Sequence, residues 1–260
     1  MDAGNLALAL TGAAAAGWVD AVVGGGGLIQ LPTLLLAAPA LPLATVLGTN
    51  KLASVAGTST AAATYLTRTK VDWRVLGPAV GLALCSAGLG ALLAGSVPGY
   101  AYRPVVLVVL AAVAVVVTLR PRLGTALGRD AVSPGRKVAA VALAGLLIAA
   151  YDGAIGPGTG TFLILTFTAT LGVDFLHGSA MAKAVNVATN VGALVVFGSA
   201  GHVAWLLGAG MATANVLGAR LGAHTALRRG SAFVRVVLLV VVLALLVRLG
   251  TDEFFALRGW

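Results

Sequence analysis

Two stretches of sequence decide the fold: VDAVVGGGGLIQLPTLLL at residues 19–36 and YDGAIGPGTGTFLILT at residues 151–166. In each stretch an aspartate ends an apolar run, a glycine cluster begins four residues later, and a second apolar run follows. Glycine weakens a helix, and broken backbone at membrane depth is tolerated where protein or a water-filled cavity covers it. The pattern therefore predicts membrane helices that break inside the bilayer.

The composition of the whole chain agrees with a membrane protein. Of the 260 residues, 59% are hydrophobic and 10% are charged, with a mean hydropathy of +1.01, whereas a soluble domain carries roughly 25% charged residues. At about 20 residues per span, the chain has room for about ten membrane segments. We expect an all-α polytopic membrane protein without a catalytic head, so an enzyme is not expected.

The apolar runs give these segments: 4–23, 27–43, 44–66, 75–96, 101–119, 137–155, 158–173, 178–198, 203–223 and 231–249. The second and the seventh are short and begin in glycine clusters, so we predict half-helices or re-entrant hairpins there. A polar, basic linker at 120–137 separates a first transmembrane repeat, 1–119, from a second, 138–250. The formal net charge is +9, but the cations fall mostly between apolar runs, where they mark cytoplasmic loops and face lipid headgroups. We therefore expect contact with membrane lipid and not with nucleic acid.

The second half repeats the first at a constant spacing of 132 positions. The coincidences include residue types that are scarce in this chain: Asp20 with Asp152, Lys51 with Lys183, Trp73 with Trp205, Gly24 with Gly156 and Gly26 with Gly158. Matches among alanine, glycine, leucine and valine carry little weight here, but an aspartate, a lysine and a tryptophan on one offset indicate a tandem repeat.

Loop charge predicts that the repeat is inverted. The loop at 68–74 carries three basic residues and its counterpart at 200–206 carries only a histidine, whereas 97–103 has one arginine and 224–235 has three. Because basic residues mark cytoplasmic loops, matched loops lie on opposite faces of the membrane. We predict five segments per half, with 68–74, 120–137 and 224–235 cytoplasmic and both termini outside.

Four charged residues lie inside apolar stretches: Asp20, Lys51, Asp152 and Lys183. Such a residue at a span centre costs about 2.5–3.5 kcal/mol on insertion, and it usually lines a pathway or pairs with an opposite charge. One alternative is a structural Asp–Lys pair that fixes helix packing, although one pair would suffice for that. We expect the aspartates to pair with the lysines in the empty site or to take up protons for coupling.

A polar stripe follows each lysine. The residues three and seven positions later are polar in both halves: Ser54 and Thr58, then Asn186 and Asn190. These spacings place them on one helical face. Interhelical hydrogen bonding would explain any one of these residues, but the repeated stripe favours the lining of a cavity.

The glycine clusters predict anion-binding helix ends. A half-helix that starts at the bilayer midplane directs free N–H groups and the positive end of its dipole into a cavity. Close helix packing through glycine is the alternative. We predict substrate contacts from these residues: Gly24, Gly26, Gly156 and Gly158, with hydroxyl donors from Thr159 and Thr161.

At these residues the chain resembles a known family. GGGGLIQLPTLLL and LGTNKLAS in the first half, with YDGAIGPGTGTF and AMAKAVNVATNVGAL in the second, are similar to the TauE/SafE family of bacterial membrane permeases, in its YfcA-like branch. The likeness runs from about Gly12 to Leu249. Family members are polytopic inner-membrane proteins that export sulfite, sulfoacetate and related anions. The resemblance implies a sulfur oxyanion or organosulfonate as substrate.

The sequence thus predicts a secondary transporter, an exporter of a small anion that works by alternating access in the bacterial inner membrane. The anion would lie between the glycine clusters, facing Lys51 and Lys183, with protons as coupling ion through Asp20 and Asp152; no cofactor or metal is expected. The alternatives are carriage of an unrelated metabolite or a cation, and a membrane subunit that transports nothing. The sequence is compatible with a homo-oligomer.

Overall fold

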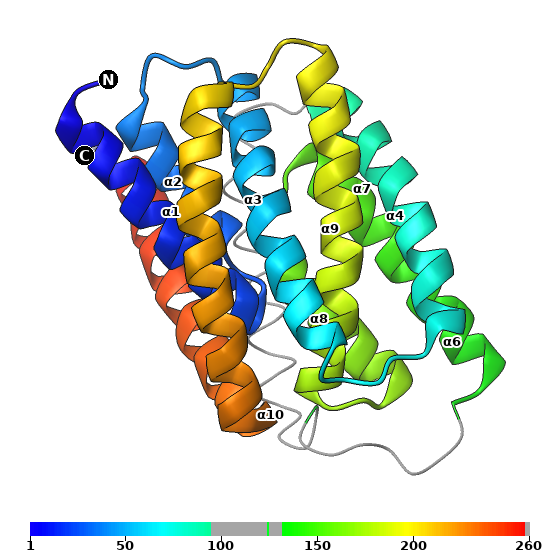
Figure 1. The fold of residues 1–260 in the computed structure, drawn as a ribbon. Helices are drawn as coiled ribbons and strands as arrows, with labels where there is room; N and C mark the ends of the chain where they lie inside the picture. Colours follow the sequence, from blue (N-terminus) through cyan, green and yellow to red (C-terminus); the bar gives the residue numbers. More distant parts are fainter. Residues whose placement is uncertain (95–123, 125–131, 258–260) are drawn as a thin grey trace.

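A computed structural model describes residues 1–94, 124 and 132–257 of the chain (Figure 1). Within these residues the fold is all-α. The helices, in chain order, are α1 (Ala3–Val23), α2 (Gly27–Ala37), α3 (Leu43–Leu66), α4 (Trp73–Leu93), α6 (Pro134–Ala142), the π-helix η2 (Leu143–Ile148), α7 (Ala149–Ala154), α8 (Thr159–Leu171), α9 (Phe175–Ser199) and α10 (Trp205–Leu257). The segments α6, η2 and α7 form one continuous helix, Pro134–Ala154.

The helix starts follow from local capping. Asp2, Ser133 and Asp174 each precede a helix and accept a hydrogen bond from the backbone N–H three residues later. Such caps satisfy N–H groups that have no partner inside the helix. Because Ser133 caps α6, that helix begins at Pro134, inside the predicted linker, and its first turn carries Lys137.

Helix length separates spanning helices from half-helices. In the part of the chain that the structure describes, four helices are long and apolar enough to cross a membrane: α1, α4, the continuous helix Pro134–Ala154, and α9. In contrast, α2 has 11 residues and α8 has 13, and helices of those lengths reach only about half-way across a bilayer. Both predicted short segments are therefore short apolar helices, and their place as half-helices in a membrane stays a prediction.

For three of the ten predicted segments the structure does not show a separate spanning helix. The segment 101–119 lies outside the described residues. The segments 203–223 and 231–249 fall in α10, whose helix is interrupted at Gly230, with φ 82° and ψ −179°. The number of ten spanning segments therefore stays a prediction.

The helices of the two halves begin at the same spacing. The starts of α2, α3 and α4 at Gly27, Leu43 and Trp73 are each followed 132 positions later by the starts of α8, α9 and α10. In Figure 1 the neighbouring helices α3 and α9 run in opposite directions along the centre of the bundle. The α3–α4 loop, the start of α6 and the break in α10 lie at one end of the bundle, and the N-terminus lies at the other.

Each half also packs against the other half through small residues. Helix α1 lies against α10, and α4 lies against the η2–α7 segment. A Cβ atom on Gly218 would lie 1.9 Å from the carbonyl oxygen of Ala14, and one on Gly153 would lie 1.9 Å from that of Ala87. Backbones therefore touch at both interfaces, as in membrane helix pairs generally. This packing brings the ends of α1 and α7 to the centre of the molecule.

Candidate functional site

The two helices that end at the centre break at glycines, as predicted. Helix α1 stops at Val23, and Gly24 is left-handed, with φ 80° and its N–H donating to the Asp20 carbonyl. In the second half α7 stops at Ala154, and both Gly156 (φ 93°) and Gly158 (φ 84°) are left-handed. A residue with a side chain rarely adopts this conformation, so the glycines produce the breaks.

The two breaks meet each other. A Cβ atom on Gly24 would lie 2.2 Å from the carbonyl carbon of Gly160, and one on Gly160 would lie 2.4 Å from the Cα of Gly24. Next to this contact, the Thr161 hydroxyl donates to the Val23 carbonyl oxygen over 2.8 Å. No side chain fits between these backbones. The start of α8 is thereby fixed against the end of α1.

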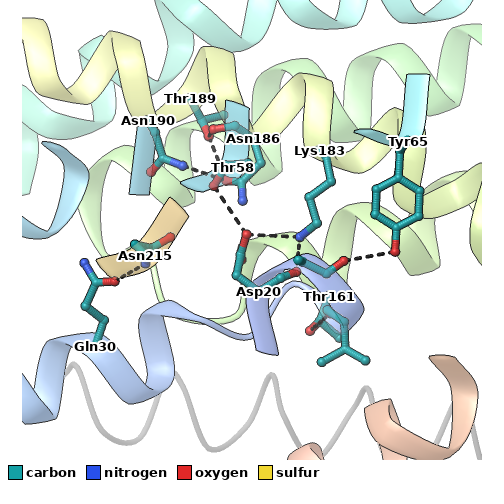
Figure 2. Close-up of polar contacts among 12 residues, drawn as sticks. Asp20, Gln30, Thr58, Tyr65, Thr161, Lys183, Asn186, Thr189, Asn190 and Asn215 are labelled. Carbon is teal, nitrogen blue, oxygen red and sulfur yellow. Dashed lines mark hydrogen bonds and ion pairs between the residues drawn. The ribbon is translucent and has the colours of Figure 1, made fainter. Parts of the chain in front are cut away.

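The buried charges form two ion pairs that cross between the halves. Lys51 on α3 lies 2.7 Å from Asp152 on α7, measured from Nζ to Oδ2. Lys183 on α9 lies 3.1 Å from Asp20 on α1 and also donates to the Asp20 carbonyl oxygen (Figure 2). The expected pairing of aspartates with lysines is confirmed, and each lysine takes the aspartate of the other half.

Both pairs are shielded from solvent. The side chains of Lys51 and Asp152 are 5% and 3% exposed, and those of Lys183 and Asp20 are 0% and 14% exposed. Removing one partner of a buried pair leaves an uncompensated charge, which costs about 3–5 kcal/mol. Each lysine therefore depends on an anion beside it, whether that anion is the aspartate or a ligand.

A small cavity lies where the breaks and the ion pairs meet. Its volume for water-sized spheres is about 20 Å³, which is enough for about one water molecule. Its lining contains these predicted residues: Asp20, Gly24, Lys51, Ser54, Thr58, Asp152, Gly156, Gly158, Thr159, Asn186 and Asn190. Residues far apart in both halves are therefore brought to one space, as the polar stripes predict.

Three predicted residues do not line this cavity. Gly26 packs against α1, where an added Cβ would lie 2.6 Å from the Ala16 carbonyl oxygen. Thr161 uses its hydroxyl to hold the end of α1. Lys183 is fully buried beneath Asp20 and does not reach the cavity. These residues hold the lining in place and are not part of it.

The hydrogen bonds of the stripes differ between the halves. Thr58 donates to the carboxylate of Asp20 over 3.3 Å. The Asn190 amide donates to the Asn186 side-chain oxygen over 3.3 Å, and Thr189 donates to that oxygen over 3.2 Å (Figure 2). The first stripe therefore touches a charge, whereas the second is satisfied largely within its own helix.

Sequence reasoning missed several residues at the site. Gly27, Asn50 and Gly160 also line the cavity. Asn50 is held from behind, because Gln30 donates to its backbone oxygen over 3.3 Å and Asn215 donates to Gln30 over 2.6 Å. For Asn50, Gln30 and Asn215 the available signal was an amide side chain within an apolar run, the same signal that marked the stripes. Gly27 and Gly160 lie within the two glycine clusters.

The donors around the cavity suit an anion. Lys51 and, from the first turn of α8, Thr159 and Gly160 line it beside the carboxylates of Asp20 and Asp152, and the Thr159 hydroxyl donates to Asp152. The early N–H groups of a helix lack partners inside the helix and carry the positive end of its dipole. Within the described residues there is no cluster of three histidine, cysteine, aspartate or glutamate side chains that could hold a metal ion.

Comparison with known proteins places this site in a transporter family. The model of the family described as sulfite exporter TauE/SafE matches residues 8–249. A probable membrane transporter protein, ORF9, of a Sinorhizobium species is 36% identical over 98% of this chain and 96% of its own length. The probable membrane transporter protein YfcA of Escherichia coli K12 is 30% identical over 87% of this chain and 82% of its own.

A further probable membrane transporter protein, from Haemophilus influenzae, is 28% identical over 94% of this chain and 92% of its own length. No solved structure matches the chain. The matches run through both glycine breaks and both lysine helices, since they cover nearly the whole sequence. The chain belongs to the sulfite exporter TauE/SafE family of membrane transporters.

Proposed function

We propose that the chain is a secondary transporter that exports a small anion, a sulfur oxyanion or organosulfonate such as sulfite or sulfoacetate. The observation that carries the proposal is the pair of crossed Lys–Asp contacts around one cavity at the point where two broken helices meet. A buried lysine whose aspartate can be replaced by a ligand supplies the positive charge that an anionic substrate needs. The family description names sulfite, which fits this chemistry.

An anion at the cavity would be held by Lys51 and by the first turn of α8. Hydrogen bonds in which one partner is charged contribute about 1.5–3 kcal/mol each. The hydroxyl of Thr159 and the amides of Asn186 and Asn190 complete a set of groups that can donate hydrogen bonds. Lys183 acts from behind Asp20, through the position that it gives to that carboxylate.

The mechanism that we propose is alternating access by an inverted repeat in the bacterial inner membrane. The equal spacing of the helix starts and the antiparallel run of α3 and α9 support inversion. The basic α3–α4 loop and the start of α6 lie at one end of the bundle, and that end is cytoplasmic by the positive-inside rule. Rocking of one half against the other would open the central cavity to each side in turn.

Coupling would come from an ion or substrate gradient, with Asp20 and Asp152 as candidate proton carriers. The cavity as described admits about one water molecule, so it corresponds to an occluded state that must widen to bind a larger anion. Displacing a carboxylate from a buried lysine changes the charge of the site unless a proton accompanies the substrate. Transport of the anion together with a proton removes that cost.

The test is a flux assay with the purified full chain in liposomes, using sulfite, sulfonates and small carboxylates, with and without a pH gradient. We expect flux of sulfur anions, reduced about 10- to 100-fold by Lys51→Met because a charged hydrogen bond is lost. Lys70→Met, an exposed lysine in the α3–α4 loop, is the matched control. Absence of anion flux in the wild-type protein would contradict the proposal, and protection of Lys51 from chemical modification by cations but not by anions would favour a cation substrate.

A further inference from the structure

We infer that the two crossed pairs have different tasks: the Asp152 carboxylate occupies the anion position on Lys51 and Thr159 and leaves it when protonated, whereas Asp20 and Lys183 form a fixed support for the first helix break. The inference rests on the proposed function, which treats both aspartates as coupling candidates. It assigns the uptake of the proton that accompanies the substrate to Asp152 alone.

Asp152 binds the same donors that an anionic substrate would use. Its Oδ2 lies 2.7 Å from the Lys51 ammonium group, and its Oδ1 accepts the Thr159 hydroxyl over 2.7 Å. Thr159 is the first residue of α8. The Asp152 carboxylate thus contacts both the Lys51 ammonium group and the Thr159 hydroxyl group at the start of α8. All three residues line the cavity. An oxyanion cannot bind these donors until the carboxylate has moved away.

The backbone hydrogen bonds of the first turn also differ between the two half-helices. In α2 the N–H groups of Leu28 and Ile29 already donate to the carbonyls of Gly25 and Gly26, over 3.1 and 3.0 Å. In the first turn of α8, among the described residues, only the N–H groups of Thr159 and Phe162 donate to carbonyls of the break, those of Gly156 and Gly158. At the matched positions, the N–H groups of Leu28 and Ile29 are thus bonded, whereas those of Gly160 and Thr161 in α8 have no backbone acceptor within the described part of the chain. In α2 only the N–H group of Gly27 is left in the same way.

The pair of Asp20 and Lys183 is instead part of a helix end. The ammonium group of Lys183 donates to the carbonyl oxygen of Asp20, which also accepts the N–H of Gly24 over 2.8 Å. Carbonyls at the end of a helix lack partners within the helix, and a cation there suits the negative end of the dipole. Since Lys183 is fully buried and outside the cavity lining, a substrate in the cavity does not reach it.

The helix that carries Asp152 is also built to change shape. Residues Leu143–Ile148 directly before α7 are π-helical, whereas α1, which carries Asp20, is α-helical throughout. π-Helical turns within α-helices are rare and are often found at functional sites. A shift of this turn to α-helical geometry would rotate the following residues about the helix axis and carry the Asp152 side chain away from Lys51.

Charge balance then couples a proton to the substrate. With Asp152 ionised the pair is neutral, so an added anion would leave a net negative charge in a buried site, which is costly. A proton taken from solution onto the Asp152 carboxylate restores neutrality, and its release accompanies release of the anion. One proton therefore moves with each single negative charge.

Other titratable groups near Asp152 are few in the described part of the chain. Besides Lys51 on α3, the helix α9 carries Lys183 and His177, which are held by Asp20 and Asp174. Helix α8 carries none, and α4 carries Arg74 at its first turn and the exposed Cys85. The hydroxyl of Tyr151, on α7 itself, donates to the Pro157 carbonyl oxygen.

The experiment measures how methanesulfonate binds to the purified full chain, from the shift that it causes in the unfolding temperature of the protein. The charge of methanesulfonate is constant over the working pH range. For the wild-type protein we expect the dissociation constant to fall about tenfold per pH unit on acidification, as for uptake of one proton. Asp152→Asn should bind at least about tenfold more tightly at neutral pH, without pH dependence, because the competing anion is gone. Asp20→Asn is the discriminating variant and should keep the wild-type slope, and Asp72→Asn, whose half-exposed carboxylate lies outside the cavity, is the control.

The outcomes separate the two proposals. No binding to the wild-type protein at any pH would contradict the proposed function itself. Binding with a pH slope that survives in Asp152→Asn, or that disappears in Asp20→Asn, would overturn only the division of tasks. If Asp152→Asn does not fold, proton uptake on mixing wild-type protein with methanesulfonate in weak buffer decides: about one proton per bound anion is expected, and no uptake would refute the inference.

Discussion

The glycine breaks at residues 24–27 and 156–161 occupy matched positions in the two halves but differ in what they do. Both take part in the tight backbone contact between Gly24 and Gly160, but after the first break the N–H groups of Leu28 and Ile29 donate to the carbonyls of Gly25 and Gly26. The second carries two left-handed glycines, Gly156 and Gly158, and the Thr159 hydroxyl beside the cavity. The comparison teaches that a repeat can duplicate a scaffold while its two copies diverge in chemistry. The following changes test that difference, from the largest expected effect to the smallest.

Gly24→Ala should abolish folding. Its Cβ atom would lie 2.2 Å from Gly160 and 2.4 Å from the N atom of Thr161, at a left-handed residue, and overlaps with backbone are among the few causes of losses above about 4 kcal/mol. Gly156→Ala, at the matched position, would meet no atom closer than 3.4 Å and should cost only the strain of the left-handed residue, about 1–2 kcal/mol. The measurement is the yield and unfolding temperature of the purified protein in detergent. Gly25→Ala, with no contact under 3.5 Å, is the control, and equal behaviour of all three variants would contradict the prediction.

Lys183→Met should destabilise the protein by about 3–5 kcal/mol, because Asp20 would remain buried without its cation. The double variant Asp20→Asn/Lys183→Met removes both charges and should recover at least half of that loss. Unfolding temperatures of the two variants and of the wild type give the comparison. A double variant no more stable than Lys183→Met would show that the ion pair is not the source of the loss.

Tyr65→Phe should cost about 1 kcal/mol of the free energy of unfolding. The buried Tyr65 hydroxyl donates to the Ala21 carbonyl oxygen over 3.0 Å, in the last turn of α1, where carbonyls lack helical partners. The residue 132 positions later is Phe197, so the change makes the first half resemble the second. Denaturant or thermal unfolding measures the effect, and an unchanged stability would mean that water satisfies this carbonyl equally well.

Asp72→Asn should have the smallest effect. Asp72 accepts a hydrogen bond from Lys137 over 2.8 Å, which holds the pKa of the Asp72 carboxyl below its usual value. A lowered pKa means stability that is present above the unfolded-state pKa and is lost as the pH falls through the folded-state pKa. Both side chains are 39% exposed, so screening limits the contribution to less than about 1 kcal/mol.

The measurement for Asp72→Asn is the difference in unfolding temperature from wild type at neutral and at acidic pH. Asp72 is the N-cap of α4, where its side chain accepts the N–H of Arg74 over 3.0 Å. Asparagine is an equally good helix N-cap, so the substitution isolates the charge. The difference should vanish in acid and shrink in high salt. The matched position in the second half is Ala204, which has no such pair, and a difference that persists in acid would contradict the electrostatic explanation.

Much of the fold could be predicted because membrane burial leaves a strong signal in sequence. The starts of α2 and α3 follow from the glycine cluster and the apolar runs and agree with the structure to within about one residue, whereas α2 ends at Ala37 and not at the predicted residue 43. Most of the predicted site residues line one cavity because side chains three or four positions apart must share a helical face, and their binding of a substrate stays a prediction. Thr161 was placed wrongly in the lining, since its side chain turns to the Val23 carbonyl, a contact between residues far apart in the chain. The π-helical turn before α7 was not predicted, because the pattern of apolar residues does not distinguish it from an α-helical turn.

What the sequence determined by itself is that Asp20, Lys51, Asp152 and Lys183 lie inside apolar helices that break at glycine, because charge and glycine are scarce in membrane spans and stand out locally. What only the tertiary structure decided is which aspartate meets which lysine, and which lysine faces the cavity. Those facts depend on how α1 and α7 cross α3 and α9. The physical reason is that a direct ion pair needs its charged atoms within about 4 Å of each other, a distance set by packing and not by position in the chain.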